Sequence, residues 1–136
     1  MSPTISADVR DQLLHSARTA MANAYAPYSN FHVGAAILTG EGKVFTGCNV
    51  ENASYGLTIC AERNAIFAAV AAGDGKIKLE IKAVAVTNSQ NVACSPCGAC
   101  RQVIAEFGKD AAIFYQGPGG VKELSAGELL PDCFSL

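Results

Sequence analysis

The sequence predicts an α/β protein in which helices cover a mixed β-sheet. A helical stripe of apolar residues opens the chain, and two apolar runs then flank the turn Gly40-Glu41-Gly42, as in a hairpin. Helical and strand patterns alternate after the hairpin. Because a strand–helix–strand crossover lays its helix on the sheet, we expect helices on the sheet faces.

The first half of the chain predicts a helix followed by the hairpin. Residues 7–24 place apolar side chains at helical spacing, and Pro27 and Asn30 break the pattern. The continuous apolar run 31–39 and the returning run 43–50 form the two hairpin strands.

The second half predicts alternating helices and strands. Residues 59–72 are rich in alanine and read as a helix that Gly73 ends, and residues 81–87 form a buried strand before a second helix at 98–107. The remaining segments are a short strand, a turn, a short helix and a tail: residues 111–115, 117–120, 125–130 and 131–136. Both main helices follow strands, and in such sheets functional sites gather at the strand carboxyl ends.

Length and composition limit the kind of protein. The chain of 136 residues is expected to form a single domain, 1–136. Half of its residues are hydrophobic, which favours self-association, because one small core cannot bury so much apolar surface. The net charge of −2 and the lack of a basic run argue against a stable nucleic-acid partner, so we expect a small-molecule substrate.

A cytoplasmic location is expected. The first ten residues lack the apolar core of a signal peptide, and no apolar stretch is long enough to cross a bilayer, so no membrane partner is expected. The six cysteines therefore read as reduced thiols rather than as a disulfide framework. Cys48, Cys94 and Cys133 are expected to be ordinary buried or half-buried residues.

Two short segments together predict a zinc site. Cys97 and Cys100 have the spacing of a metal chelate, and Cys60 offers a third thiolate from a distant point in the chain. Three protein ligands leave a fourth position open for water, and Glu62 is placed to handle that water's protons. The frames Cys60-Ala61-Glu62 and Pro96-Cys97-x-x-Cys100 match the three-cysteine form of the zinc deaminase signature.

The charge of such a site needs compensation. Three thiolates on Zn²⁺ give a formal charge of −1, which weakens the pull of the metal on bound water. Helix N-termini at both cysteine segments favour the thiolate form. Arg63 is expected to donate hydrogen bonds to ligand sulfurs and to withdraw part of the excess charge.

Two other readings of the cysteines stay open at this point. Cys-Gly-Ala-Cys at a helix start is also typical of a thiol–disulfide oxidoreductase, with Cys94 and Cys97 as a second overlapping pair. A non-enzymatic structural zinc module needs four ligands, which Cys94 could complete, whereas His15 and His32 lack a partner at ligand spacing.

Nearly the whole chain beyond Tyr25 resembles the cytidine deaminase family, in its small homotetrameric, zinc-dependent form. The shared motifs are Pro27-Tyr28-Ser29, Phe31-x-Val33-Gly34-Ala35-Ala36, Gly47-x-Asn49-x-Glu51-Asn52-Ala53-Ser54-Tyr55-Gly56, Cys60-Ala61-Glu62-Arg63, Ser95-Pro96-Cys97-Gly98-Ala99-Cys100-Arg101-Gln102 and Leu129-Leu130-Pro131. The resemblance implies a three-layer α/β/α fold with a mixed sheet of roughly five strands and one Zn²⁺ per chain. It also implies deamination of cytidine and deoxycytidine to uridine and deoxyuridine in pyrimidine salvage.

The resemblance also implies the contacts of the nucleoside. Asn49 and Glu51, two residues apart on a predicted strand, would face the same side and bind the ribose hydroxyls. The other implied positions are Phe31 lining the pocket, the backbone of Ala61 and Ser95 at the base, Phe134 from a neighbouring subunit, and Tyr55 at the subunit interface.

Two related activities remain as alternatives. A deaminase of the blasticidin type shares the Cys-Ala-Glu and Pro-Cys-Gly-x-Cys frames, although Asn52-Ala53-Ser54-Tyr55-Gly56 favours cytidine. Editing of cytosine in RNA or DNA uses the same chemistry, but the acidic balance of the chain gives a polyanion little to bind.

Overall fold

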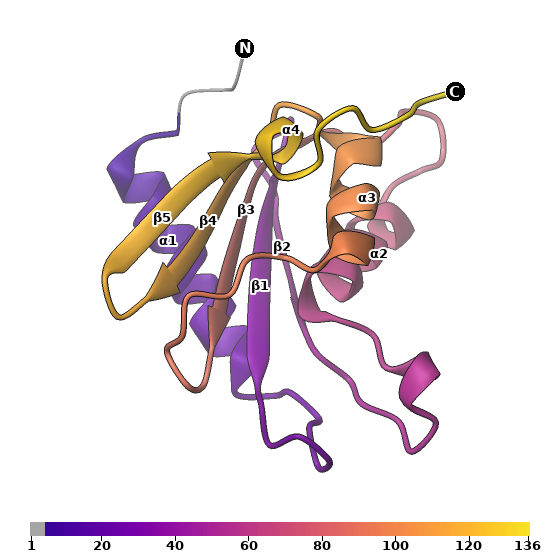
Figure 1. Ribbon diagram of the computed structural model, residues 1–136. Helices are drawn as coiled ribbons and strands as arrows, with labels where there is room; N and C mark the ends of the chain where they lie inside the picture. The colour runs from indigo at the N-terminus through magenta and orange to yellow at the C-terminus, as the bar shows by residue number, and fades with distance from the viewer. Residues whose placement is uncertain (1–4) are drawn as a thin grey trace.

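The computed structural model in Figure 1 describes residues 5–136. Residues 1–4, which open the segment considered above for a signal peptide, lie outside the described residues. The elements in chain order are α1 (Ala7–Met21), β1 (Val33–Thr39), β2 (Val44–Cys48), the 3₁₀ helix η1 (Tyr55–Leu57), α2 (Ala61–Ala72), β3 (Ile81–Asn88), α3 (Gly98–Phe107), β4 (Ala112–Gly117), β5 (Gly120–Ser125) and α4 (Ala126–Leu129). Each helix within residues 5–136 is too short or too polar to cross a membrane.

The five strands form one mixed sheet in the order β2-β1-β3-β4-β5, which confirms the predicted α/β class. β1 pairs antiparallel with both β2 and β3, β3 pairs parallel with β4, and β4 pairs antiparallel with β5. Because β2 and β3 both oppose β1, they point in the same direction. The helices that follow these two strands therefore begin at the same edge of the sheet.

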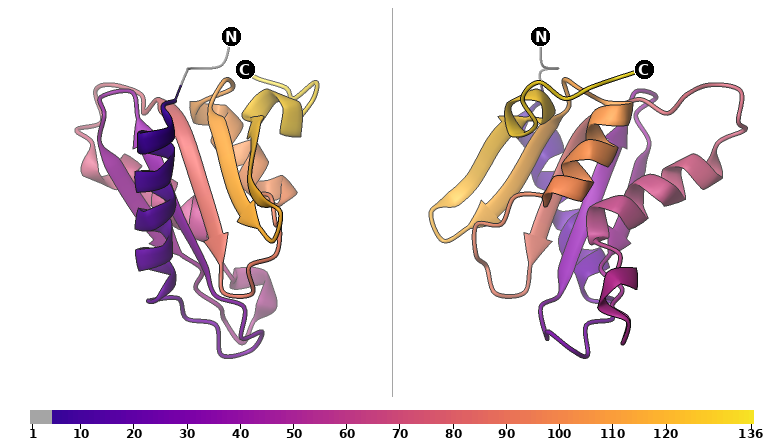
Figure 2. Two further views of the ribbon diagram at one scale, coloured as in Figure 1. Left: turned by 90° about the vertical axis from the view of Figure 1, so that its left-hand side faces the viewer. Right: turned by 45° about the vertical axis from the view of Figure 1, so that its right-hand side comes forward.

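Helices cover both faces of the sheet, as the three-layer prediction requires. α1 packs one face through Leu13, Leu14 and Ala17, which contact small and apolar side chains of β1, β3 and β4. α2 and α3 pack the opposite face, where Ile66 and Ile104 are fully buried. In the right-hand view of Figure 2, α2 and α3 lie in front of the strands and α1 lies behind them.

The helix that carries Cys60 is shorter than the predicted range 59–72. Ile59 and Val50 exchange two backbone hydrogen bonds of 3.0 Å, so Ile59 belongs to an extended pair and cannot enter the helix. Cys60 takes an extended conformation as the N-cap, and α2 begins at Ala61. The thiol of Cys60 therefore lies at the N-terminus of α2.

Both hairpin strands are also shorter than predicted, because the side chain of Asn49 takes the place of backbone hydrogen bonds between the two strands. Asn49 Oδ1 accepts a hydrogen bond of 2.8 Å from Val33 N, and Asn49 Nδ2 donates one of 2.8 Å to Phe31 O. β1 consequently starts at Val33, and β2 ends at Cys48. The prediction that Asn49 and Glu51 lie on a strand is wrong, since both follow its end.

The sequence patterns did not locate β5. Its first four residues are exposed and do not alternate in polarity, so they give no strand signal, and antiparallel pairing with β4 defines the strand instead. The short predicted helix at 125–130 is present as α4, with Ser125 as the N-cap. The Ser125 hydroxyl and the Glu128 carboxylate bond reciprocally to each other's backbone N–H groups, as in a capping box.

Gly47 lets the first turn of α2 lie directly on β2. A Cβ atom at this position would stand 2.6 Å from the carbonyl oxygen of Ala61, which is closer than real side chains approach. Asn64 Nδ2 adds a hydrogen bond of 2.8 Å to Cys48 O at the end of the strand. The absence of a side chain at Gly47 and this hydrogen bond fix the turn that carries Glu62.

Candidate active site

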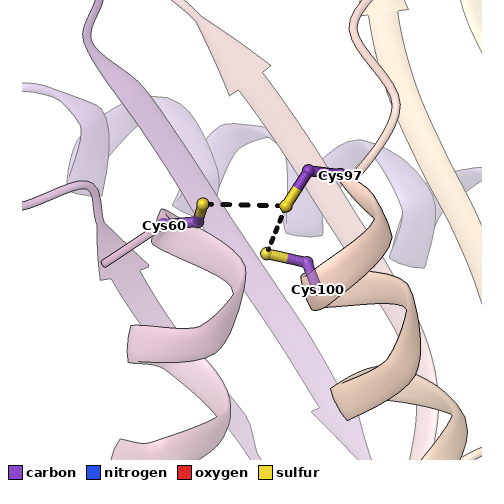
Figure 3. A group of neighbouring side chains, drawn as sticks. All are labelled: Cys60, Cys97 and Cys100. Carbon is purple, nitrogen blue, oxygen red and sulfur yellow. Dashed lines mark hydrogen bonds between the residues drawn. The ribbon is translucent and has the colours of Figure 1, made fainter. Parts of the chain in front are cut away.

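Three cysteines meet where α2 and α3 begin. Cys60 is the N-cap of α2, Cys97 is the N-cap of α3, and Cys100 lies in the first turn of α3. The Sγ atoms of Cys60 and Cys97 are 3.9 Å apart, and those of Cys97 and Cys100 are 3.5 Å apart. Figure 3 shows the three thiols pointing toward one another from the two helices.

The cluster has the dimensions of a zinc site. Tetrahedral Zn²⁺ with Zn–S bonds of about 2.3 Å places its sulfur ligands roughly 3.8 Å apart, close to both sulfur separations in the cluster. Among residues 5–136, no fourth histidine, cysteine or carboxylate atom joins the group of three. The residues therefore fit zinc with one position open, and this favours a reactive centre over a four-ligand structural one.

Hydrogen bonding within the cluster shifts the pKa values of Cys60 and Cys100 in opposite directions. Bonding from Cys100, with further help from Arg63, lowers the pKa of Cys60 to about 5, against the opposing effect of burial. Bonding to Cys60 and burial raise the pKa of Cys100. These interactions favour the thiolate form at Cys60 and the protonated form at Cys100, and a bound cation would favour the thiolate form of its ligands.

Glu62 lies in the first turn of α2, two residues after Cys60, and only 4% of its surface is exposed. Burial is the main reason that its pKa rises to about 7, and the charge of Cys60 raises it further. A carboxyl group with a pKa near neutrality can both accept and release a proton at physiological pH. Its position and pKa fit the predicted proton-handling role.

Arg63 points at the sulfur cluster, as expected from its position beside a ligand. Its Nη2 donates a hydrogen bond of 3.4 Å to Cys60 Sγ. Bonding to Cys60 and Cys100 raises the pKa of the guanidinium, so this cation is permanent. Its Nε atom is buried and has no hydrogen-bond partner among the described residues.

Arg101 joins the loop before α3 to α4, and sequence reasoning missed these contacts. Its Nε donates to Pro96 O at 2.7 Å, and its Nη2 donates to Ser95 Oγ at 2.8 Å. Its Nη1 donates to Leu129 O at 2.9 Å, so it also anchors α4. Arg101 therefore holds the loop that leads into Cys97. The only available sequence signal was its place next to Cys100.

The residues predicted to bind ribose are tied to the loop before β1. Asn49 is buried and bonds to Phe31 O, while Glu51 accepts hydrogen bonds from Tyr28 N at 2.9 Å and Ser29 N at 3.2 Å. Since Val50 pairs with Ile59 next to Cys60, this segment adjoins the one that carries the first thiol.

The other predicted substrate and interface positions differ in their exposure to solvent. Ala61 is fully buried, and Ser95 lies under Arg101, one residue before the buried Pro96. Tyr55 is 76% exposed and meets Tyr28 edge to face, with ring centroids 6.0 Å apart. Phe134 is 73% exposed and lines a hollow with Phe107, at the end of α3 opposite the thiols.

None of the six cysteines is paired in a disulfide in the described structure. Cys48 and Cys133 are half-buried, as expected, but Cys94 is exposed, because the loop before Pro96 leaves it uncovered. Cys94 is not one of the three clustered thiols, so no four-cysteine zinc site is present among the described residues.

Three clustered thiols with an open position, beside a buried carboxyl group that titrates near neutrality, define a zinc-dependent hydrolytic enzyme. A family profile described as "Cytidine and deoxycytidylate deaminase zinc-binding region" matches residues 8–116. The chain belongs to this family.

Individual relatives agree with the assignment. The chain is 44% identical over 128 residues to a cytidine deaminase of Halalkalibacterium halodurans, covering 93% of this chain and 94% of that protein. The crystal structure of a cytidine deaminase from Burkholderia pseudomallei superposes with a TM-score of 0.82 and 51% identity, over 91% of this chain and 98% of that one. A blasticidin-S deaminase of Bacillus cereus is 33% identical over 105 residues, covering 74% of each chain.

Proposed function

We propose that this chain catalyses the zinc-dependent hydrolytic deamination of cytidine and deoxycytidine to uridine and deoxyuridine, with release of ammonia, as in pyrimidine salvage. The observation that carries the proposal is the buried carboxyl group of Glu62, with a pKa of about 7, beside three thiols at zinc-ligand separations. Hydrolysis of an amidine needs an activated water and a group that moves protons, and this site offers both.

In the proposed site Cys60, Cys97 and Cys100 hold the metal, and bound zinc supplies an acidified water at its open position. Glu62 accepts the proton of that water and delivers it to N3 of the base. The water oxygen adds to C4, and Glu62 passes the second proton of that oxygen to the exocyclic amine, which leaves as ammonia as the C4 carbonyl forms. Arg63 balances the charge of the thiolates through its hydrogen bond to Cys60 Sγ.

The nucleoside is proposed to lie beside the segment that joins β2 to α2. Asn49 and Glu51 offer an amide and a carboxylate for the sugar hydroxyls, and Phe31 lines the pocket. The backbone of Ala61 and Ser95 binds the edge of the base. The proximity of this segment to Cys60, through the Val50–Ile59 pair, supports this arrangement.

We also propose that the active unit is a homotetramer in which Phe134 covers the pyrimidine ring of a neighbouring subunit. α3 has ten residues, so its two ends are roughly 15 Å apart, and Phe134 lies near the end away from Cys97. A ring in this place cannot close the pocket of its own chain, but its exposure suits a pocket of another chain. Tyr55, also exposed, is proposed to lie at the interface.

The cytoplasm is the proposed location, because three free thiol ligands need a reducing compartment. Residues 1–136 are proposed to act as one domain.

Loss of cytidine absorbance in the presence of purified, zinc-loaded protein tests the proposal directly. We expect turnover of cytidine and deoxycytidine, complete loss after chelation, and recovery when zinc is restored. Blasticidin S offered in the same assay tests the alternative activity. A zinc-loaded protein that leaves both cytidine and deoxycytidine unchanged would contradict the proposed function.

A further inference from the structure

The hydroxyl group of Ser29 lies between the carboxylate of Glu51 and the backbone of Phe31. Ser29 Oγ donates a hydrogen bond to Glu51 Oε2 and accepts one of 3.0 Å from Phe31 N. One small side chain in the loop before β1 therefore connects two positions that the proposed function assigns to the nucleoside pocket.

The carboxylate of Glu51 depends on this hydroxyl for its orientation. Its Oε1 is held by the backbone amides of Tyr28 and Ser29, at 2.9 Å and 3.2 Å. Within residues 5–136, the only partner of Oε2 is the Ser29 hydroxyl. An ionised carboxylate has about four lone-pair sites. Three are filled by residues 28 and 29, and no described residue fills the fourth.

The pKa of Glu51 agrees with this geometry. The Ser29 hydroxyl is the largest cause of its fall below the ordinary value, ahead of the two backbone amides. The carboxylate therefore stays ionised at neutral pH and remains a pure acceptor for ligand hydroxyl groups.

We propose that Ser29 is a positioning residue for the sugar of the substrate, because its hydroxyl fixes the Glu51 carboxylate in the orientation that accepts the sugar hydroxyls. The inference rests on the proposed function, in which Glu51 contacts ribose. Ser29 itself does not touch the reacting atoms, so it should affect substrate binding and leave the proton transfers of Glu62 unchanged.

Ser29→Ala removes the hydroxyl and keeps the backbone amides that bind Oε1. Since a hydrogen bond to a charged group is one of the stronger kinds, we expect the KM for cytidine to rise about tenfold, with kcat within about twofold of wild type. Ser29→Thr retains a hydroxyl and should restore KM. Zinc content and melting temperature should match those of the wild type.

Two comparisons separate this role from a general loosening of the loop. Ser89 Oγ accepts a hydrogen bond of 3.0 Å from His32 N in the same region but does not contact Glu51, so Ser89→Ala is the matched control. The second comparison uses 2′,3′-dideoxycytidine, which lacks both secondary sugar hydroxyls. The penalty of Ser29→Ala on kcat/KM should fall to about twofold or less with this analogue.

An equal penalty for cytidine and the dideoxy analogue, an unchanged KM for cytidine, or the same effect from Ser89→Ala would each overturn the inference while leaving the function intact. Wild-type turnover of cytidine establishes the function independently of these variants. Wild-type protein that does not deaminate cytidine would overturn both proposals.

Discussion

Replacement of Glu62 by glutamine keeps the size of the side chain and removes its ability to carry a proton. Loss of a proton shuttle lowers the rate by at least ~10²-fold, so we expect kcat for cytidine to fall by that factor or more. The three thiols are untouched, and the variant should therefore bind the same amount of zinc as the wild type. Glu62→Ala should show the same loss of rate.

The same substitution should stabilise the metal-free protein at neutral and alkaline pH. Burial raises the pKa of Glu62 from the ordinary value of 4.5 to about 7. At about 1.4 kcal/mol for each pKa unit, this difference corresponds to about 3 kcal/mol of folding free energy. Below pH 4.5 the carboxyl group is protonated in both the folded and the unfolded state, so it costs nothing. Between pH 4.5 and 7 the unfolded chain releases its proton first, and the wild type loses stability progressively.

Urea unfolding of both metal-free proteins at a series of pH values measures this difference. The stability of Glu62→Gln relative to the wild type should increase by about 3 kcal/mol from pH 4.5 to pH 8 and then remain constant. A difference that does not change with pH would show that the carboxyl group is hydrated and would refute the burial argument. A variant that keeps more than about a hundredth of the wild-type rate would refute the proton-shuttle role.

Three further predictions concern the metal, the core and the oligomer. Cys97→Ala should lose zinc in elemental analysis and Cys94→Ala should retain it, because Cys97 belongs to the clustered thiols and Cys94 does not. The reverse result would show that zinc binds through Cys94 and not through Cys97. Gly47→Ala should lower the free energy of unfolding by about 1 to 3 kcal/mol, since the new methyl group meets the first turn of α2; an unchanged urea midpoint would contradict this close approach. Phe134→Ala should weaken cytidine binding by about 0.5 to 1.5 kcal/mol without changing the oligomer mass, and mixing it with Glu62→Ala should restore activity in hybrid oligomers. Lack of complementation despite proven subunit exchange would show that each chain builds its own pocket.

Elements and motifs that depend on residues close together in the chain could be predicted from sequence patterns. The helix predicted at 98–107 has the same bounds as α3, because its apolar spacing and its N-terminal cysteine motif coincide. Cys97 and Cys100 could be paired from sequence because metal chemistry restricts the spacing of ligands, and the match to the zinc deaminase signature added Cys60. The open fourth position followed from counting the available ligands, and the structure adds the sulfur separations.

Contacts between distant segments could not be predicted in this way. The strand β5 is exposed and exists through its pairing with β4, so its own residues carry little signal. The side chain of Asn49 shortens the hairpin by taking over backbone groups near residue 31, and no periodicity reveals such a substitution. Arg101 reaches Leu129, 28 residues later in the chain, which depends on the packing of α4 beside α3.

Charge balance explains why the three cysteines lie beside two helix N-termini and Arg63. Three thiolates around Zn²⁺ leave one excess negative charge, and this charge would make the bound water less acidic. The N-terminus of α2 lies at Cys60 and that of α3 at Cys97, and each contributes about half a positive charge. The guanidinium of Arg63 adds a full positive charge through its hydrogen bond to Cys60 Sγ. In the proposed site these contributions would outweigh the excess, so zinc held by the three cysteines could acidify its water as strongly as zinc held by neutral ligands. Because Gly47 and Asn64 seat the first turn of α2 on β2, the sheet positions both the compensating dipole and Glu62.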